Sequence, residues 1–301
     1  MEPWVIALVA VSAVLHLAWN VRLKTAGDPL RAATIGMVAA SVGIVPLGAA
    51  VWFSQGRPDL PPEGVALGLA SGVVEAAYFI FLSAAYRRGD LSVVYPLARG
   101  TAPLLAVVIG VVVFGERLGI AGSVGVIALL AGFLILQRPW RAFALARSGG
   151  GSARKAAWDS AVLFALATGV MIATYTAIDR AGTRLIDVLT YAAILWATCA
   201  VVLVAWVAFA AGGDLLRYGP AAAHRAAVGG WLTLAAYLCI LVALSVAPLS
   251  GVAPLRESAT VFAAAWGSVR MGEASDRSEA VRRIGASVLI VGGALLLAVG
   301  D

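Results

Sequence analysis

The sequence predicts an all-α membrane protein in which ten transmembrane helices form two inverted repeats of five helices each. Three observations lead to this fold class. Hydrophobic residues make up 61% of the chain and charged residues only 13%, with a mean hydropathy of +0.94, whereas soluble domains contain about 45–50% apolar and about 25% charged residues. Ten apolar runs are long enough to cross a bilayer. The second five runs repeat the first five, with charged residues at matching depths.

The first half of the chain contains five of these runs. A helix needs about 20 apolar residues to span a hydrocarbon core about 30 Å thick, so a helix is predicted wherever such a run lies between polar breaks. The first run follows Met1 almost at once, without a basic leader or a cleavage site. We therefore expect it to stay in the mature protein rather than act as a removable signal peptide. The predicted helices are 4–23, 30–53, 65–86, 91–114 and 120–136.

A long polar connection, residues 137–156, follows these helices and divides the chain into repeats 1–136 and 157–301. It is rich in arginine and lysine and contains three consecutive glycines, Gly149, Gly150 and Gly151, a composition typical of a flexible basic linker. Five further apolar runs follow it. The predicted helices of the second half are 159–180, 187–210, 226–247, 252–271 and 281–299.

Pairs of residues recur between the halves at a nearly constant offset of 157 to 160 positions. Such self-similarity indicates an internal repeat. Because each half has an odd number of predicted spans, the second half must enter the membrane from the opposite side, which produces inverted repeats, as in many transporters. The matching pairs are Leu91-Ser92 with Leu249-Ser250, Pro96-Leu97 with Pro254-Leu255, Gly115-Glu116 with Gly272-Glu273, and Tyr78 with Tyr237.

The distribution of positive charge predicts the orientation. Arginines and lysines gather in the loops after odd-numbered helices, including the linker 137–156. Loops after even-numbered helices carry only Arg57, Arg117, Arg180 and Arg184. Since cytoplasmic loops are enriched in Lys and Arg, the linker is expected in the cytoplasm and both termini outside.

Several stretches of the sequence resemble the EamA-type transporters of the drug/metabolite transporter superfamily. The resemblance covers nearly the whole chain. It implies a secondary transporter of ten helices, in two five-helix repeats, that moves small metabolites such as amino acids, often outward, across the bacterial inner (plasma) membrane. The stretches are 95–103 (YPLARGTAP) and 114–118 (FGERL), their echoes 254–258 (PLRES) and 271–273 (MGE), and the matching signatures 16–20 (HLAWN) and 175–179 (YTAID).

Four charged residues are expected inside the hydrocarbon, away from the ends of the predicted spans: Glu75, Arg99, Arg256 and Glu257. A lone charge at the centre of a membrane helix costs roughly 2.5 to 3.5 kcal/mol, so each needs a reason to be there. One interpretation is a buried network that locks the repeats together, because the four charges sum to zero and Arg99 falls opposite Glu257 in the repeat. In the other, they line a cavity where an arginine binds a substrate carboxylate and a glutamate binds an ammonium group.

Glu75 stands out because its repeat counterpart, Leu234, is apolar. A carboxyl group held away from water favours its neutral form and could exchange a proton during a transport cycle. Glu75 is therefore the candidate proton-coupling residue. The alternative is an ordinary ion pair with Arg99 or Arg256, which would keep Glu75 ionised.

Other polar and aromatic residues are candidates for a substrate cavity. His16 and Asn20 share one face of the first helix, as do Tyr175 and Asp179 on the sixth. Asp179 is expected near the membrane surface, in a structural role. The full set of predicted substrate-binding residues is Arg99, Glu257, Tyr78, Tyr237, His16, Asn20, Tyr95, Arg256 and Tyr175.

One stripe of small residues on the third predicted helix, Gly64, Gly68, Gly72 and Ala76, predicts a close helix-helix contact.

The motifs exclude several function classes. There is no GxxxxGK[ST] loop for ATP, no HExxH or GxSxG motif for catalysis, and no Cys/His spacing for zinc. We therefore expect a non-enzyme without metal or cofactor, and no nucleic-acid binding despite the net charge of +6. The expected partners are a small-molecule substrate, the lipid bilayer and protons as the candidate coupling ion, with monomer and homodimer both open. A lipid-intermediate flippase or an accessory membrane scaffold is the alternative function.

Overall fold

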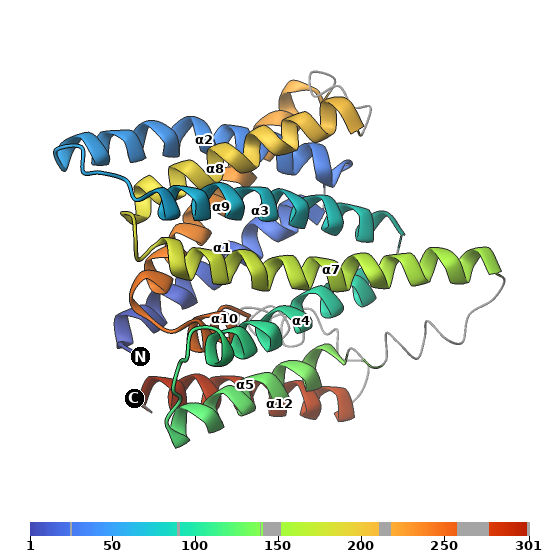
Figure 1. Cartoon of the computed structure of the whole chain (residues 1–301). Helices are drawn as coiled ribbons and strands as arrows, with labels where there is room; N and C mark the ends of the chain where they lie inside the picture. Colours follow the sequence, from blue (N-terminus) through green and yellow to red (C-terminus); the bar gives the residue numbers. More distant parts are fainter. Residues whose placement is uncertain are drawn as a thin grey trace.

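The computed structural model describes residues 1–24, 26–88, 91–138, 140, 152–210, 218–257 and 277–299, and the regular elements within these ranges are all helices (Figure 1). Each predicted span overlaps at least one of these helices, although the bounds differ, most at 252–271, where a helix is described only up to Glu257. The elements are α1 (Pro3–Lys24), α2 (Pro29–Ser54), α3 (Pro62–Arg88), α4 (Leu91–Val112), α5 (Ile120–Gln137), α7 (Ser152–Gly182), α8 (Val188–Ala205), the π-helix η1 (Trp206–Ala210), α9 (Pro220–Val246), α10 (Leu249–Glu257) and α12 (Arg277–Val299).

Five helices of the described chain are long and apolar enough to cross a membrane: α2, α3, residues 160–182 of α7, α8 with η1, and α9. Residues 3–16, 98–112 and 120–135 form shorter apolar helices. Large apolar side chains on the outside, such as Ile120, Val42 and Phe209, are mostly exposed, as expected where a helix faces lipid. The all-helical membrane fold predicted from composition is confirmed at this level, and the chain is an integral membrane protein.

One boundary differs from the sequence prediction. Residues 152–156, assigned to the flexible linker, form the start of α7. Hydropathy marks only the part of a helix that lies in the hydrocarbon. The residues before it are mainly alanine, arginine and lysine, which are good helix formers and continue the helix in water.

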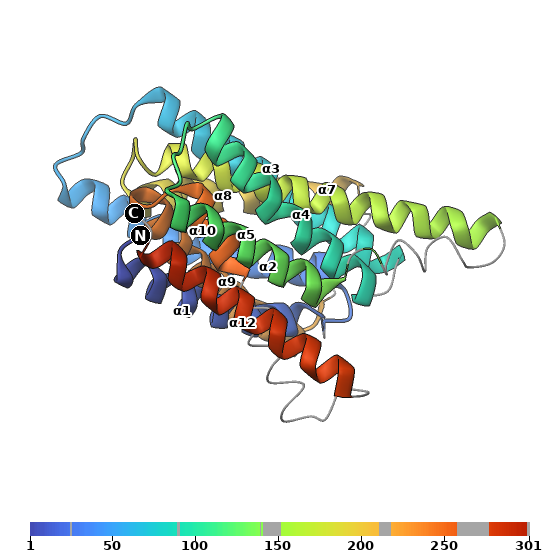
Figure 2. The same ribbon diagram turned by 90° about the horizontal axis from the view of Figure 1, so that it is seen from below.

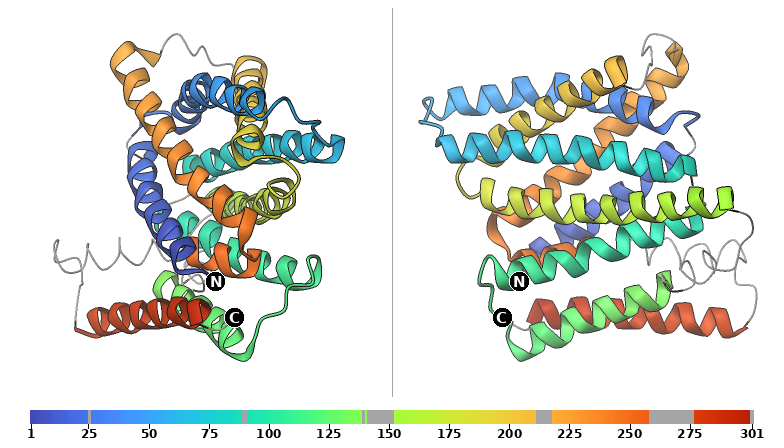
Figure 3. Two further views of the ribbon diagram at one scale, coloured as in Figure 1. Left: turned by 90° about the vertical axis from the view of Figure 1, so that its left-hand side faces the viewer. Right: turned by 45° about the vertical axis from the view of Figure 1, so that its right-hand side comes forward.

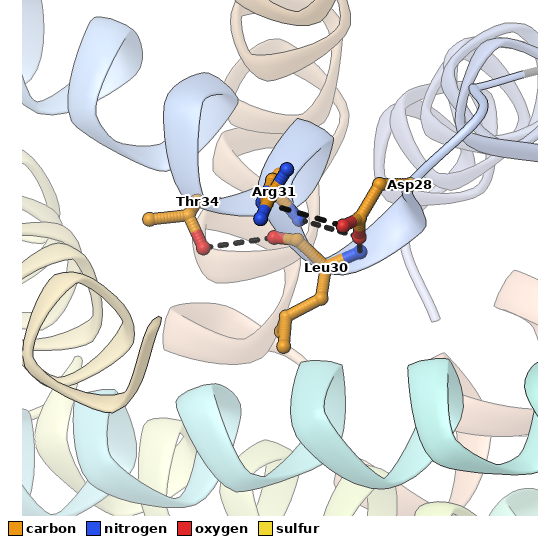
Figure 4. Close-up of polar contacts among 4 residues, drawn as sticks. All are labelled: Asp28, Leu30, Arg31 and Thr34. Carbon is orange, nitrogen blue, oxygen red and sulfur yellow. Dashed lines mark hydrogen bonds and ion pairs between the residues drawn. The ribbon is translucent and has the colours of Figure 1, made fainter. Parts of the chain in front are cut away.

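Two aspartates begin helices at equivalent places in the two halves. The Oδ1 atom of Asp28 accepts hydrogen bonds from the backbone N–H groups of Leu30 (3.1 Å) and Arg31 (3.2 Å), and caps α2 (Figure 4). Asp187 caps α8 in the same way, through the N–H groups of Leu189 and Thr190. A side-chain cap satisfies backbone donors that a helix start leaves without a partner. The two caps are 159 positions apart, within the range of the repeat offset.

The long helices run roughly along one direction of the molecule, so their connections gather at two ends (Figures 1 and 2). We call the end that holds Met1, the end of α12 and loops 55–61, 113–119 and 183–187 the terminal end. The opposite end, where α1 finishes and α7 and α9 begin, is the linker end. In Figure 1, α1 and α7 run in opposite directions, as do α2 and α8, and α5 and α12.

Contacts between the halves come in corresponding pairs. If α1 to α5 are matched in order with α7, α8, α9, α10 and α12, the contact of α3 with α7 corresponds to that of α1 with α9. Likewise the contact of α3 with α8 corresponds to that of α2 with α9. Each of α2, α4 and α5 also packs against its own counterpart. The α5–α12 pair lies at one edge of the bundle (Figure 3).

Glycines allow the closest of these approaches. A Cβ atom added at Gly72 of α3 would lie 2.6 Å from the Leu195 carbonyl oxygen of α8. One added at Gly230 of α9 would overlap the backbone of Gly36 in α2. Gly72 corresponds to Gly230 and Gly36 to Leu195 at offsets of 158 and 159, so both crossings use the same place in the repeat. The close contact predicted from the glycine stripe of the third helix is confirmed, and its partner is α8.

Candidate functional site

Polar side chains from both halves meet in the interior of the bundle. We call this group, which comes from α3, α4, α7, α9 and α10, the central cluster. Its four charged members are almost completely buried, with exposed fractions of 3% for Glu75, 7% for Arg99, 0% for Asp179 and 4% for Arg256. Such burial requires polar partners. The members are Glu75, Tyr78, Arg99, Tyr175, Asp179, Tyr237 and Arg256.

Asp179 is the most strongly hydrogen-bonded of them. Its Oδ1 atom accepts from the Ser71 hydroxyl (2.5 Å) and the Tyr191 hydroxyl (2.8 Å), and its Oδ2 atom accepts from the Tyr237 hydroxyl. These donors lie on α3, α8 and α9, so one carboxylate of α7 holds three other helices. Hydrogen bonds to an ionised acceptor are stronger than those between neutral groups.

The expectation that Asp179 lies near the membrane surface stays a prediction, since the residue lies close to the end of the apolar segment 160–182, and its side chain is buried inside the bundle. Helix α7 continues to Gly182, and Tyr191 of the following helix folds back over this turn, where a Cβ added at Gly182 would meet the Tyr191 ring. Position along the sequence indicated a helix end, but the side chain faces the core. The signal available in the sequence was the four-residue spacing of Tyr175 and Asp179, which places them on one face.

Arg256 lies among aromatic rings next to this carboxylate. One guanidinium nitrogen, Nη2, donates to the Tyr175 hydroxyl at 3.2 Å. The central guanidinium carbon lies 6.0 Å from the centre of the Tyr175 ring and 5.9 Å from that of Tyr237. A cation over aromatic faces at this distance is attracted by the ring quadrupoles. Arg256 is thus positioned by both α7 and α9.

Glu75 has no such set of contacts. Its Oε2 atom is buried and has no hydrogen-bond partner among the described residues. Glu75, Arg99 and Arg256 are all described, and no ion pair within 4.0 Å joins the first to either of the others. The charges of Asp179 and Arg256 still act on it through space. A buried carboxylate without a partner is costly, so the site fits a carboxyl group in its protonated form.

The tyrosines of the cluster form one connected row. Tyr78 and Tyr237, predicted as a pair from the repeat, both pack edge-on against Tyr175, with ring centres 5.9 and 5.7 Å away. Trp196 continues the row beyond Tyr237. On the other side, Phe79 follows Tyr78 at 4.8 Å. The structure therefore brings three predicted aromatic residues together beside Arg256.

His16 lies on α1 at the border of the cluster. Its Nδ1 atom is 3.0 Å from the Ser12 carbonyl oxygen and 3.1 Å from the Ser12 hydroxyl, which itself donates to the Ala236 carbonyl oxygen at 2.7 Å. The charges of Arg256 and Arg99 act on the imidazole. Three other predicted residues cannot be placed, because the side chains of Asn20, Tyr95 and Glu257 lie outside the described part of the structure.

A cavity of about 230 Å³ opens at the linker end between α1, α2 and α9. We call it the vestibule. Small and apolar residues line most of it, with Arg22 and Arg225 near its mouth. Trp19 and Phe79 form its inner wall, with ring centres 6.4 Å apart. None of the predicted site residues whose side chains the structure describes lines it. Phe79 contacts Tyr78, so the wall lies directly against the central cluster.

At the terminal end, a carboxylate joins the halves. The Oε1 atom of Glu116 accepts from the Leu249 N–H group at 2.7 Å, and its Oε2 atom accepts from the Ser250 N–H group at 2.9 Å. These are the first N–H groups of α10, where the helix dipole favours a negative charge. The Nε atom of Arg180 lies 3.8 Å from Oε1. Gly115, with φ of +62°, makes the turn that brings Glu116 there.

Metal-binding geometry is not found in the described residues, where no three His, Cys, Asp or Glu side chains could hold one ion together. Sequence reasoning proposed Glu75, Arg99, Arg256 and the tyrosines as candidates, but gave no role to Ser71, whose hydroxyl group donates to Asp179.

Comparison with known proteins identifies one family. Residues 3–138 match the EamA-like transporter family, which belongs to the drug/metabolite transporter superfamily. The resemblance predicted from the motifs is confirmed. A solved crystal structure is similar over 97% of this chain and 95% of that chain, with a TM-score of 0.66 and 21% sequence identity, and shows that the fold is shared. No curated protein matches the chain.

Proposed function

We propose, from the match of residues 3–138 to the EamA-like transporter family, that the chain is a secondary active transporter that exports a small metabolite by alternating access. The family match supports a membrane transporter of the drug/metabolite type. The proposed substrate is a small polar or amphipathic molecule, such as an amino acid. The observation that carries the proposal is the central cluster, in which the Glu75 carboxyl group keeps a buried oxygen without a partner beside Arg256 and Asp179.

The proposed architecture is ten membrane crossings in two inverted repeats, 1–136 and 157–301, joined by the region 137–156. Three observations support it. Corresponding helices run in opposite directions, contacts between the halves come in corresponding pairs, and the Gly72 and Gly230 crossings occupy equivalent places. Inverted repeats place substrate at their interface near the bilayer midplane, and the position of the central cluster between α3, α7, α9 and α10, from both halves, supports such a site.

Within this site we assign the residues as follows. Arg99 and Arg256 bind the carboxylate of a zwitterionic substrate, and Glu257 binds its ammonium group. The rings of Tyr78, Tyr175 and Tyr237 surround its apolar part. His16, Asn20 and Tyr95 border the site. Glu75 takes up a proton from one side of the membrane and releases it to the other, which couples transport to a proton gradient.

The direction of transport is inferred from the difference between the two ends of the bundle, one with a cavity and one held closed. The vestibule opens at the linker end, while Glu116 holds α10 at the terminal end. Because positive loops gather at the linker end, we place that end in the cytoplasm and the protein in a bacterial inner (plasma) membrane. The described conformation then receives substrate from the cytoplasm. Rearrangement of one repeat against the other releases it outside in exchange for protons.

The test is proton-driven transport in proteoliposomes. In Glu75→Gln, whose amide cannot ionise, we expect pH-driven transport of a radiolabelled amino acid to fall at least about 100-fold, while counterflow exchange at equal pH is retained. The matched control is Glu63→Gln, an exposed position in the first turn of α3, which should leave both activities unchanged.

Two results would contradict the proposal. Unaltered pH-driven transport in Glu75→Gln would remove this residue from proton coupling. Absence of counterflow for every amino acid tested, even in the unmodified protein, would favour a flippase or scaffold over a metabolite transporter.

A further inference from the structure

We propose that the vestibule is a binding site for an amphipathic organic anion, a small molecule with an apolar body and one carboxylate. The inference deepens the proposed transport function and rests on it, because the vestibule would be the place where substrate is first held before it reaches the central cluster. It is independent of which residues bind substrate deeper in the protein.

The charged side chains among the described residues that line the vestibule, Arg22 and Arg225, are both positive. The nearby acidic side chain, Asp28, is occupied, since it caps α2 and lies 3.4 Å from the Nε atom of Arg31 (Figure 4). Guanidinium groups bind carboxylates through paired hydrogen bonds. The mouth of the vestibule therefore favours an anion.

The interior of the vestibule favours an apolar body. Its inner wall is made of the Trp19 and Phe79 rings, and its sides are alanines, glycines, Leu23 and Met37. The Trp19 indole N–H group is buried and has no acceptor among the described residues. The wall therefore holds an unused hydrogen-bond donor beside two aromatic surfaces. A ligand with its apolar part inward and its carboxylate at the arginines matches both regions.

The volume of the vestibule favours a small ligand over a lipid. At about 230 Å³, the cavity lies below the usual range of ligand pockets, about 300–1,000 Å³. It has room for a small metabolite and not for two acyl chains. The inference therefore commits to a water-soluble carboxylate rather than to an anionic lipid.

Neighbouring glycines allow the vestibule to be filled without disturbing the fold. A Cβ atom added at Gly229 would meet nothing within 4 Å, whereas one added at Gly230 would overlap α2. Gly229 lines the vestibule, so Gly229→Leu places a side chain in the ligand space. Gly285→Leu on α12 is the matched control, because a Cβ there also meets nothing within 4 Å and Gly285 does not line the vestibule.

The experiment is calorimetric titration of the purified full chain in nanodiscs with 3-phenylpropionate, 3-phenylpropanol and 3-phenylpropylamine. These probes share one apolar body and differ in charge. We expect the carboxylate to bind at least about tenfold more tightly than the alcohol and the amine. Arg225→Gln should weaken its binding about tenfold, added salt should weaken it further, Gly229→Leu should abolish it, and Gly285→Leu should leave it unchanged.

Equal or tighter binding of the amine, or undiminished binding in Gly229→Leu, would overturn the inference. Repeating the titration in phosphatidylglycerol and phosphatidylcholine nanodiscs tests the lipid source, since loss of probe binding only in phosphatidylglycerol would assign the site to an anionic headgroup. Counterflow exchange separates the two proposals. Exchange without probe binding contradicts the vestibule site alone, whereas probe binding without any exchange contradicts the transport function alone.

Discussion

At the scale of single residues, the central cluster contains two carboxyl groups in opposite situations. Asp179 accepts hydrogen bonds from three hydroxyl groups, whereas the Oε2 atom of Glu75 has no partner among the described residues. The first arrangement stabilises the ionised form of a carboxyl group, and the second lacks that stabilisation. This difference supports the proposed roles, structural for Asp179 and proton-coupling for Glu75.

Asp179→Asn should destabilise the protein by about 1–3 kcal/mol, because an amide N–H₂ group replaces one acceptor and a buried tyrosine hydroxyl loses its partner. Thermal unfolding in detergent measures the loss. Asp187→Asn is the matched control, since asparagine caps a helix about as well as aspartate and the melting temperature should hardly change. Equal melting temperatures for the two variants would contradict the structural role of Asp179.

At the scale of helices, packing depends on where one backbone can approach another. Gly229 and Gly230 are adjacent in α9, yet a Cβ atom is accommodated at the first and excluded at the second. The difference arises because only Gly230 faces α2. A Cβ atom should likewise be excluded at Gly72, because this residue faces α8 at the corresponding crossing.

Gly230→Ala should therefore destabilise the protein by about 1–3 kcal/mol, because α2 and α9 must move apart. Gly229→Ala should be neutral or stabilise by up to about 1 kcal/mol, since alanine is the better helix former and meets open space. Chemical unfolding of both variants, followed by circular dichroism, gives the comparison. A stable Gly230→Ala protein would show that this crossing is not close.

Prediction from sequence succeeded for helices and less well for side chains. Hydropathy located α2 and α8 to within a few residues because apolar length is what a bilayer requires. It missed the first residues of α7, which need no lipid, and could not show the surroundings of Asp179, which depend on Ser71, Tyr191 and Tyr237 from three other helices. Contacts between distant segments are set by tertiary packing, which periodicity in one helix does not encode. Glu75 was found because a buried charge is visible in the sequence itself.

At the scale of the whole molecule, the two ends differ. The vestibule opens at the linker end, whereas at the terminal end Glu116 of the first half binds the start of α10 in the second. The proposed alternating access requires these roles to be exchanged during the cycle. Under that proposal, the hydrogen bonds that hold one end closed set the balance between two conformations, and weakening them shifts the population toward the other.

Glu116→Gln should shift the balance between the two conformations by about 1–2 kcal/mol. The glutamine amide has one oxygen acceptor instead of two, so one hydrogen bond to the start of α10 is lost. The negative charge that interacts with the α10 helix dipole and with Arg180 is also removed. The population open at the terminal end should rise about 5- to 30-fold.

The measurement uses spin labels at Arg117→Cys and Arg184→Cys in a protein that also carries Cys199→Ala and Cys239→Ala. The labels report the distance across the terminal end. The longer distance should become more populated in Glu116→Gln and stay unchanged in Glu63→Gln. An identical distance distribution in the two variants would mean that Glu116 stabilises α10 without controlling access, and closure of the terminal end would then have to depend on the packing of α4 against α10.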